Sequence, residues 1–512
     1  MWIKKELPSL QIIILEANKE FQHKIGESTL SGFCKAIRDN GISHEAFQSL
    51  FFTKKGLGYW FCDEENEELT SAPEYIIETF DETFQIERRV FDSLLEANCI
   101  KNNIKIIKGA FVAPDESNFS SNGNNLIYYL EGKREEMKCK IVVDASGPAS
   151  ILSNQDSIGG GYIPSDVPFQ TSSVWAYFKD VNWLKNYDDW KFRAAFSRDE
   201  YTQHLCFKEG WIWYIPITSW QKSNTQNLNK MLSYLADGKN KMYDRDVLAK
   251  TFNCKYEQIW SIGISLRNDR DDSILKKSPN EVFSKYLKKI PSFGKMMEGA
   301  RILADHYPNH TPYAKRISFR KHSKNIAGDG WLAIGDAAFF VDPLRSPGLL
   351  GGAAISFHAK TAIIKAFKQQ DFGKNVFQGY INRIQELHEM MEDQSQISYL
   401  SHNHPKAITL ARRFGEIASR GHFEEFKHIE KYEFNDTNVW GHLYTKHFRM
   451  QKEFLKIMLD EENKVNSTKP LAKQTIKDYE NMVERLEKLI SSHLEKNEYL
   501  NPYFVENKLI VK

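Results

Sequence analysis

The sequence has few cysteines, and no two of them lie close together. Six are spread over 512 residues without a Cys-x-x-Cys pair, which favours reduced thiols and argues against a disulfide framework or a metal site. No apolar run approaches the ~18 residues of a membrane span, and no secretion signal opens the chain. These absences predict a cytoplasmic protein with no membrane span.

The sequence also lacks the large net charge that would indicate a polyanionic partner. Lys and Arg number 69 against 67 acidic residues, a formal net charge of +2, so neither nucleic acid nor an anionic membrane is an expected partner. By contrast, 41% of the residues are hydrophobic and 13% are aromatic, enough for a large core in two or three domains.

The order of predicted elements indicates an α/β fold. Residues 1–160 alternate strands and helices, and three consecutive glycines, Gly159–Gly161, mark a break. We expect a Rossmann-like domain over residues 1–160 and 305–370, and a substrate-side sheet domain over 161–304. A helical, charged region follows from residue 371 to 512.

The last long predicted helix carries one apolar stripe. Ile476, Tyr479, Val483, Leu486 and Ile490 alternate spacings of three and four residues, which places them on one helix face. The stripe favours packing against the sheet domain over an exposed coiled-coil arm.

The N-terminal segment resembles a dinucleotide-binding unit without its glycine turn. Residues 11–16 form a short apolar strand ending at Glu16, where such a unit has the acid that accepts from the adenosine ribose hydroxyls. A Gly-x-Gly-x-x-Gly turn is expected about 20 residues upstream of that acid, and none precedes Glu16. We therefore expect the 512-residue chain to bind a dinucleotide weakly and to expose two strand edges, through a misplaced start codon or a real deletion.

Two short motifs are the most specific features of the sequence. The first reads Trp-x-Trp-x-Ile-Pro and comprises Trp211, Trp213, Ile215 and Pro216. The second reads Phe-x-x-Pro-x-x-Ser-x-Gly and comprises Phe340, Pro343, Ser346 and Gly348. Both resemble signatures of flavin-dependent halogenases, and the resemblance covers roughly residues 1–360.

The second motif lies between a buried strand with a Gly-Asp turn and a helix rich in small residues. At such a junction, backbone N–H groups can face an anionic ligand. The resemblance implies that Gly335 and Asp336 hold the ribityl chain of FAD, with Pro343 also beside the cofactor. A plain turn with a capping aspartate is the alternative for the Gly-Asp pair taken alone.

The resemblance also implies a halide site in this loop, with candidates Ser346, Gly348 and Leu349. Pro347 has no N–H group, so it removes one backbone donor and leaves those of Gly348 and Leu349. Tryptophan halogenases carry Glu directly before the serine, whereas this chain has Arg345. A cation at that position favours an acidic or phenolic substrate over an indole.

Three further segments resemble FAD-binding elements of the family. Residues 24–28 match its Lys-Ile-Gly-Glu-Ser turn, although they also suit an ordinary capped helix start. Arg88 matches the Arg-x-x-Phe-Asp helix beside the flavin, with a solvated arginine as the alternative. Asp144 ends an apolar strand at a small-residue turn and matches a second phosphate-side contact, where Pro148 replaces the usual arginine.

Lys54 is the catalytic candidate. Halogenases have a lysine before a glycine and an aromatic strand at this distance past the Gly-Glu-Ser turn, and the match favours Lys54 over Lys55. An amine can hydrogen-bond hypohalous acid or be halogenated by it. Partial burial and the adjacent Lys55 would both lower the pKa of Lys54, whereas a solvated lysine pair is the alternative.

Trp211 and Trp213 alternate on a predicted strand, so both point to one face, which alone would indicate core packing. The resemblance implies that they line the passage near the flavin and keep the substrate away from it. It further implies FAD reduced by a separate flavin reductase, O2, halide and a small aromatic substrate, free or carrier-tethered, in secondary metabolism. A monooxygenase of the same fold and a truncated non-catalytic flavoprotein are the alternatives.

Overall fold

The computed structural model describes residues 1–62, 69–71, 77–182, 200–221, 225–238, 242–304, 312–402, 451–460, 462, 481, 483–489 and 491–492. Within these residues no helix is both long and apolar enough to cross a membrane. The same residues contain no group of three or more His, Cys, Asp or Glu side chains that could hold a metal ion.

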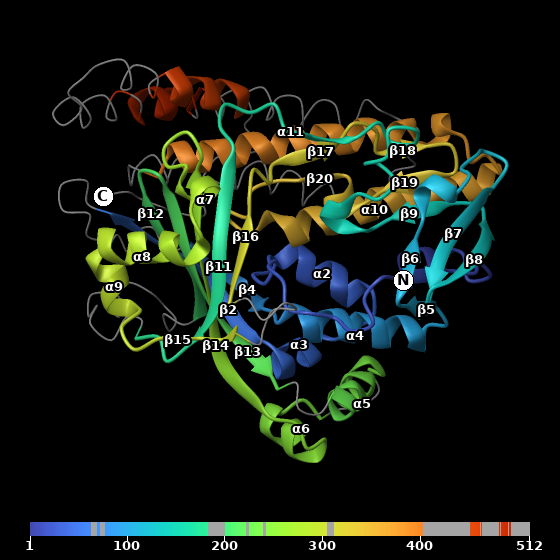
Figure 1. The fold of residues 1–512 in the computed structure, drawn as a ribbon, viewed down its shortest axis with the longest axis horizontal. Helices are drawn as coiled ribbons and strands as arrows, with labels where there is room; N and C mark the ends of the chain where they lie inside the picture. Colours follow the sequence, from blue (N-terminus) through green and yellow to red (C-terminus); the bar gives the residue numbers. More distant parts are fainter. Residues whose placement is uncertain are drawn as a thin grey trace.

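The molecule combines one large sheet with several small ones and two long helices, α10 and α11, that pack side by side (Figure 1). The labelled helices among the described residues are α1 (Trp2–Glu6), α2 (Ser31–Asp39), α3 (His44–Leu50), α4 (Arg88–Lys101), α5 (Thr225–Ala236), α6 (Arg245–Thr251), α7 (Ser273–Lys276), α8 (Pro279–Lys289), α9 (Pro291–Met296), α10 (Pro347–Gln369) and α11 (Gln378–Leu400). Residues 451–460 and 483–489 are also helical.

The large sheet has nine strands in the order β15-β11-β14-β13-β12-β2-β3, with β16 paired to β11 and β4 to β2. Its strands are β2 (Phe52–Cys62), β3 (Leu69–Ser71), β4 (Ile77–Gln85), β11 (Thr171–Lys179), β12 (Tyr201–Phe207), β13 (Gly210–Trp220), β14 (Tyr256–Arg267), β15 (Arg301–Ile302) and β16 (Tyr313–Arg316). The sheet includes β2, β3 and β4, which precede the expected range 161–304, and β16, which follows it. The earlier strands join the sheet through the parallel pairing of β2 with β12.

The central strand β13 is buried along its whole length because both faces of the sheet are covered. Trp211 and Trp213 lie in the apolar cluster on one face. Ile212 and Tyr214 lie in the cluster on the other face, where α8 and α9 pack. The alternation predicted for the Trp-x-Trp strand is therefore confirmed.

The described part of the C-terminal region packs on the same face as the two tryptophans. Val483 and Leu486 belong to that apolar cluster. The predicted packing against the sheet is confirmed for these two residues. Ile476, Tyr479 and Ile490 of the same predicted stripe lie outside the described residues.

The Rossmann-like part contains two parallel strand pairs that share no strand among the described residues. β1 (Ile13–Glu16) pairs with β5 (Lys105–Lys108), and β9 (Val142–Asp144) pairs with β19 (Trp331–Ala333), which β18 extends. The side chains of Ile14 and Val143 in these pairs are 37% and 38% exposed. The remaining short elements are β18 (Ala327–Gly328), β6 (Ala110–Val112), β7 (Asn124–Leu130), β8 (Lys133–Cys139), β10 (Tyr162–Pro164), β17 (Lys321–Ser323), β20 (Phe339–Phe340), and the 3-10 turns Pro114–Glu116, Gly147–Ala149, Gly335–Ala337 and Lys374–Phe377.

Candidate active site

Two turns meet where a pair of parallel strands ends. Asp144 of β9 lies opposite Ala333 of β19, so both strands end at the same edge of their sheet. The turn after Asp144 and the Gly335–Asp336 turn are joined because the N–H of Ile334 donates to Asp144 O at 2.9 Å. Gly335 has φ +57°, a left-handed conformation that favours glycine.

The Asp144 carboxylate is used inside its own turn. Its Oδ1 accepts from the N–H of Ser146 at 2.9 Å, and its Oδ2 accepts from the N–H of Leu152 at 2.9 Å. The side chain is buried. Asp144 thus fixes the shape of the turn. Because both of its carboxylate oxygens are already used, the predicted phosphate contact would come from the backbone of the turn.

Charged groups from three segments gather beside the second turn. Asp336 is half-buried, and burial raises the pKa of its carboxyl, while Arg316, Arg88 and Lys24 act in the opposite direction. Arg88 begins α4, and its Nη1 donates to Ile25 O at 3.1 Å. The structure therefore brings Asp336 and Arg88 together, and their contact with FAD stays a prediction.

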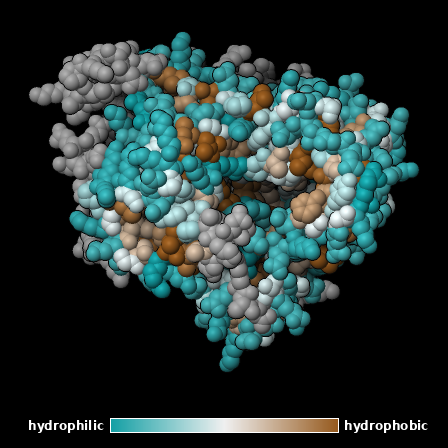
Figure 2. Space-filling view, viewed as in Figure 1, coloured by the Kyte–Doolittle hydropathy of each residue, from teal (hydrophilic) through white to brown (hydrophobic). Residues whose placement is uncertain are grey.

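A side chain at Gly26 would meet the guanidinium of Arg88. Gly26 has φ +97°, and a Cβ atom there would lie 2.7 Å from Arg88 Nη1. Figure 2 shows a hollow in the surface, which in the orientation shared with Figure 1 lies between α10 and α2.

Glu16 ends β1, where its Oε1 accepts from the backbone and side-chain amides of Asn18 at 2.8 and 2.9 Å.

Lys54 lies on β2 with its side chain almost completely buried, at 1% exposure. Its Nζ donates to Thr29 O at 2.7 Å. Burial lowers the pKa of Lys54 to about 7, opposed by the nearby Cys34 thiol. The low pKa expected from the sequence is therefore present, but burial causes it, and Lys55 is not among the causes because neighbouring strand residues point apart.

Glu27 is a buried carboxyl that the sequence did not single out as functional. It belongs to the Gly-Glu-Ser turn, and its Oε1 accepts from the hydroxyl of Tyr177 on β11. Burial raises its pKa to about 7, opposed by hydrogen bonds from Tyr177 and Ser261. The matched turn motif was the available signal, but its partners on β11 and β14 become visible only in the folded sheet.

His204 stacks in a column of aromatic rings on the sheet. Its ring lies 4.6 Å from that of Tyr59 and 5.2 Å from that of Trp211, with interplanar angles of 17° and 26°. Burial lowers the pKa of His204 to about 3, and nearby Lys54 and Arg345 contribute to the shift. This neutral imidazole, which the sequence did not single out, thus lies near both the lysine and the second motif.

The Trp-x-Trp strand is held by polar contacts as well as packing. Trp211 Nε1 donates to the hydroxyl of Tyr399 at 3.0 Å, and Trp213 Nε1 donates to Ser261 Oγ at 3.2 Å. Ile215 and Pro216 continue the same buried strand. Hydrogen bonds therefore hold both tryptophans in one position, with Trp211 stacked on His204.

The second motif forms a strained loop at the start of α10. Arg345 and Ser346 have φ +68° and +60°, and a left-handed conformation costs a non-glycine residue roughly 1–2 kcal/mol. α10 begins at Pro347, and no side-chain hydrogen bond caps it. Its first N–H groups, those of Gly348 and Leu349, are therefore available to an anion.

Other residues of this loop are placed around the strained turn. Phe340 lies in β20, with the guanidinium of Arg316 4.2 Å from its ring centroid. Pro343 is half-buried, and its O accepts from the N–H of Ser346 at 2.9 Å. The guanidinium of Arg345 makes no hydrogen bond or ion pair with any described residue, and its Nε is fully buried.

The tryptophan halogenase family model matches residues 61–225. A flavin-dependent halogenase, malA, of Malbranchea aurantiaca is 27% identical over 370 residues, 68% of this chain and 54% of the relative. A 1H-pyrrole-2-carbonyl-[peptidyl-carrier protein] chlorinase of Pseudomonas fluorescens is 27% identical over 308 residues, 59% of this chain and 55% of the relative. The chain spans about half the length of these curated relatives.

Solved structures show the same fold over nearly the whole chain. Halogenase PltM in complex with phloroglucinol and FAD has a TM-score of 0.73 at 16% identity, covering 96% of this chain and 92% of that one. The brominase Bmp2 has a TM-score of 0.58 at 19% identity, covering 82% and 88%. In the two motifs, in the segment matched by the family model and in fold, the chain is therefore similar to flavin-dependent halogenases.

Proposed function

We propose that this protein halogenates an electron-rich aromatic ring, using halide, O2 and FAD that a separate flavin reductase reduces. The observation that carries the proposal is the buried amine of Lys54, whose pKa is lowered to about 7. A lysine that accepts an electrophile must be a free amine, and burial supplies that form near neutral pH.

The residues around the Gly335–Asp336 turn fit a bound flavin. The carboxyl of Asp336 is half-buried and makes no side-chain hydrogen bond with the described residues, so it can accept from a ribityl hydroxyl. Arg316, Arg88 and Lys24 lie close enough to it to act on its charge. A bound reduced flavin would supply two electrons to O2, and the activated oxygen would oxidise halide to hypohalous acid.

Lys54 would then transfer the halogen through nitrogen. The free amine attacks the halogen of hypohalous acid, so an N–halogen bond forms, the O–halogen bond breaks and water leaves. Attack by the ring carbon breaks the N–halogen bond, and the proton lost from the ring returns the nitrogen to its amine form. Thr29 O, 2.7 Å from Nζ, holds the amine in one orientation.

The start of α10 is the proposed halide site. The N–H groups of Gly348 and Leu349 and the hydroxyl of Ser346 are the donors, and Pro347 contributes none. The wall formed by Trp211 and Trp213 would keep the aromatic substrate away from the flavin, so that only halide-sized species react there.

Arg345 favours an acidic or phenolic substrate. Its guanidinium has no anionic partner among the described residues and contributes to the pKa shifts of the neutral groups His204 and His402. A guanidinium in such a setting is stabilised by an anion. PltM, whose structure contains the phenol phloroglucinol, supports a phenolic ring, whereas the Pseudomonas relative acts on a carrier-bound pyrrole.

We expect halogenated product only when halide is present. The purified chain would be incubated with FAD, a flavin reductase, O2 and a panel of phenols and indoles, with and without chloride or bromide. Mass spectrometry should show one halogen in place of one hydrogen. Hydroxylated product formed equally well without halide would contradict halogenation and favour a monooxygenase, with the missing N–H of Pro347 as the reason.

Replacing Arg345 with glutamine should weaken the binding of acidic or phenolic substrates. Loss of one hydrogen bond to a charged group corresponds to about a 10- to 100-fold decrease in kcat/KM for such rings. Steady-state kinetics measure this effect, and a neutral indole is the internal control because it makes no ion pair. An equal decrease for both classes of ring would show that Arg345 supports the loop and does not recognise the substrate.

A further inference from the structure

One buried carboxylate connects the second motif to the large sheet. Asp342, which is fully buried, lies between Phe340 and Pro343 of that motif. Its Oδ1 accepts from the N–H of Leu344 at 2.9 Å, and its Oδ2 accepts from Thr171 Oγ1 on β11 at 2.7 Å. The same carboxylate therefore shapes the loop backbone and ties it to a strand.

Tyr399 of α11 connects that carboxylate to the first motif. Its hydroxyl donates to Asp342 Oδ2 at 2.9 Å and accepts from Trp211 Nε1 at 3.0 Å. Ser265 Oγ on β14 lies 2.8 Å from the same hydroxyl. The tyrosine has one proton, which goes to Asp342, and an indole N–H can only donate, so Ser265 must donate to Tyr399.

The network continues to a second serine on β11. Ser173 Oγ donates to Ser265 Oγ at 2.9 Å, so Ser265 accepts one hydrogen bond and donates another. All of these side chains are buried, where an unmatched polar group is costly and apolar residues would suffice for packing alone. Such a network stabilises one arrangement of the elements that it joins.

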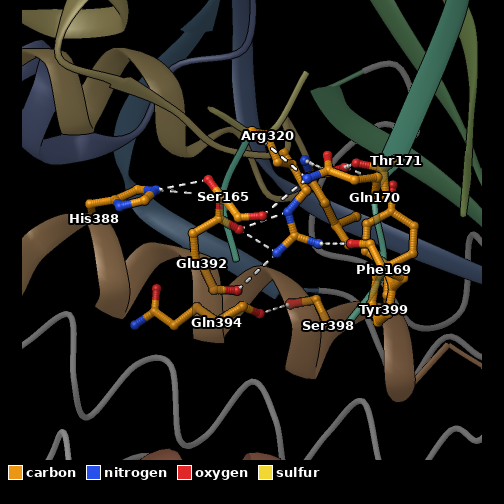
Figure 3. A network of polar contacts seen from close by, with 12 residues as sticks. Ser165, Phe169, Gln170, Thr171, Arg320, His388, Glu392, Gln394, Ser398 and Tyr399 are labelled. Carbon is orange, nitrogen blue, oxygen red and sulfur yellow. Dashed lines mark hydrogen bonds and ion pairs between the residues drawn. The ribbon is translucent and has the colours of Figure 1, made fainter. Parts of the chain in front are cut away.

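A cation lies beside the network. Figure 3 shows Arg320, which is fully buried, with its guanidinium directed at Glu392 of α11, near Thr171 and Tyr399. Arg320 also interacts electrostatically with Asp342. The helix α11 therefore contributes both the tyrosine and the carboxylate that hold this region.

We propose that Asp342 and Tyr399 are positioning residues. They hold the loop of residues 344–349, which contains the proposed halide donors, in one fixed arrangement with the strand β13 that carries Trp211. The catalytic meaning of this arrangement rests on the proposed halogenation. Arg345 and Ser346, which directly follow the turn at Leu344, are both left-handed. Such strain persists only where the surroundings enforce it, and the anchored Asp342 carboxylate is the nearest source of that constraint.

The test compares Tyr399→Phe with Tyr286→Phe. Tyr286, on α8, is a matched control because its hydroxyl also donates to an aspartate, Asp271, at 2.6 Å. Hydrogen exchange followed by mass spectrometry should show about 10-fold or faster exchange of the amides from 344 to 349 in Tyr399→Phe alone. The halide concentration for half-maximal halogenation should rise several-fold, while the rate at saturating halide changes little.

Thr171→Val provides a milder variant if Tyr399→Phe does not fold. It removes one donor to Asp342 without changing the side-chain volume much, so loop exchange should rise less than in Tyr399→Phe. Unchanged exchange in the loop, or an equal rise throughout the chain, would overturn the positioning role. Faster loop exchange in a protein that never halogenates any substrate would support positioning and contradict the proposed function.

Discussion

Lys54→Ala should abolish halogenated product while reoxidation of the reduced flavin by O2 continues. In the proposed mechanism the amine acts after the flavin chemistry is complete, so its loss would remove the group that fixes the electrophile against one ring carbon. We expect at least about a 10³-fold decrease in product formation, because a positioned reactant contributes a large effective concentration. Product is measured by mass spectrometry, and flavin reoxidation by absorbance in the same reaction.

Lys55→Ala is the matched control for this variant, because Lys55 is the next residue on β2 and is only half-buried. It should retain most of its activity. Lys54→Arg should be as inactive as Lys54→Ala, because a guanidinium remains protonated and cannot act as a free amine. Full activity of Lys54→Ala with loss in Lys55→Ala would instead assign the role to the neighbouring lysine.

The same amine predicts a pH dependence with a defined sign. Burial lowers the pKa of Lys54 to about 7, so the unprotonated amine predominates above pH 7 and is lost below it. Halogenation should therefore fall about tenfold for each pH unit below 7. Burial also raises the pKa of Glu27 to about 7, so the profile should be repeated in Glu27→Gln, where the lysine limb must persist.

Part of the geometry of the candidate site could be predicted from the sequence because its residues occur in short motifs. The face shared by Trp211 and Trp213 followed from strand periodicity, and the low pKa of Lys54 followed from the partial burial expected for it. The cause of that shift was only partly predictable. Adjacency in sequence suggested Lys55 as a cause, whereas the side chains of consecutive residues in a strand point to opposite faces of the sheet.

The polar residues that support these motifs were not predictable, because their partners come from distant segments. Tyr399 lies in a helix with no motif of its own, and its contacts with Trp211 and Asp342 bridge 188 and 57 residues of sequence. The parallel pairing of β2 with β12 likewise brings Lys54 near His204. Local periodicity carries no information about such pairings, which depend on the order of strands in the sheet.

Arg320→Met should cause the largest loss of stability among these substitutions. Arg320 is fully buried, its Nε donates to Glu392 Oε2 at 2.7 Å, and its Nη1 donates to Phe169 O at 3.1 Å. Removal of the guanidinium leaves the Glu392 carboxylate buried without its cation, which costs about 3–5 kcal/mol. For a chain of 512 residues, calorimetry should show a thermal midpoint lower by about 3–5 °C.

The double variant Arg320→Met/Glu392→Met separates the pair from its surroundings. Because it removes both charges and keeps apolar volume, it should recover most of the lost midpoint. Burial acts to raise the pKa of Glu392, but His388 and Arg320 together hold it below its ordinary value. The ion pair therefore stabilises the protein fully at pH values above the ordinary pKa of a glutamate. This stabilisation is lost as the pH falls through the lowered pKa. The difference between wild type and Arg320→Met should therefore narrow in acid. A single variant as stable as wild type at pH 7, or a double variant as unstable as the single one, would show that the ion pair does not hold α11 against the sheet.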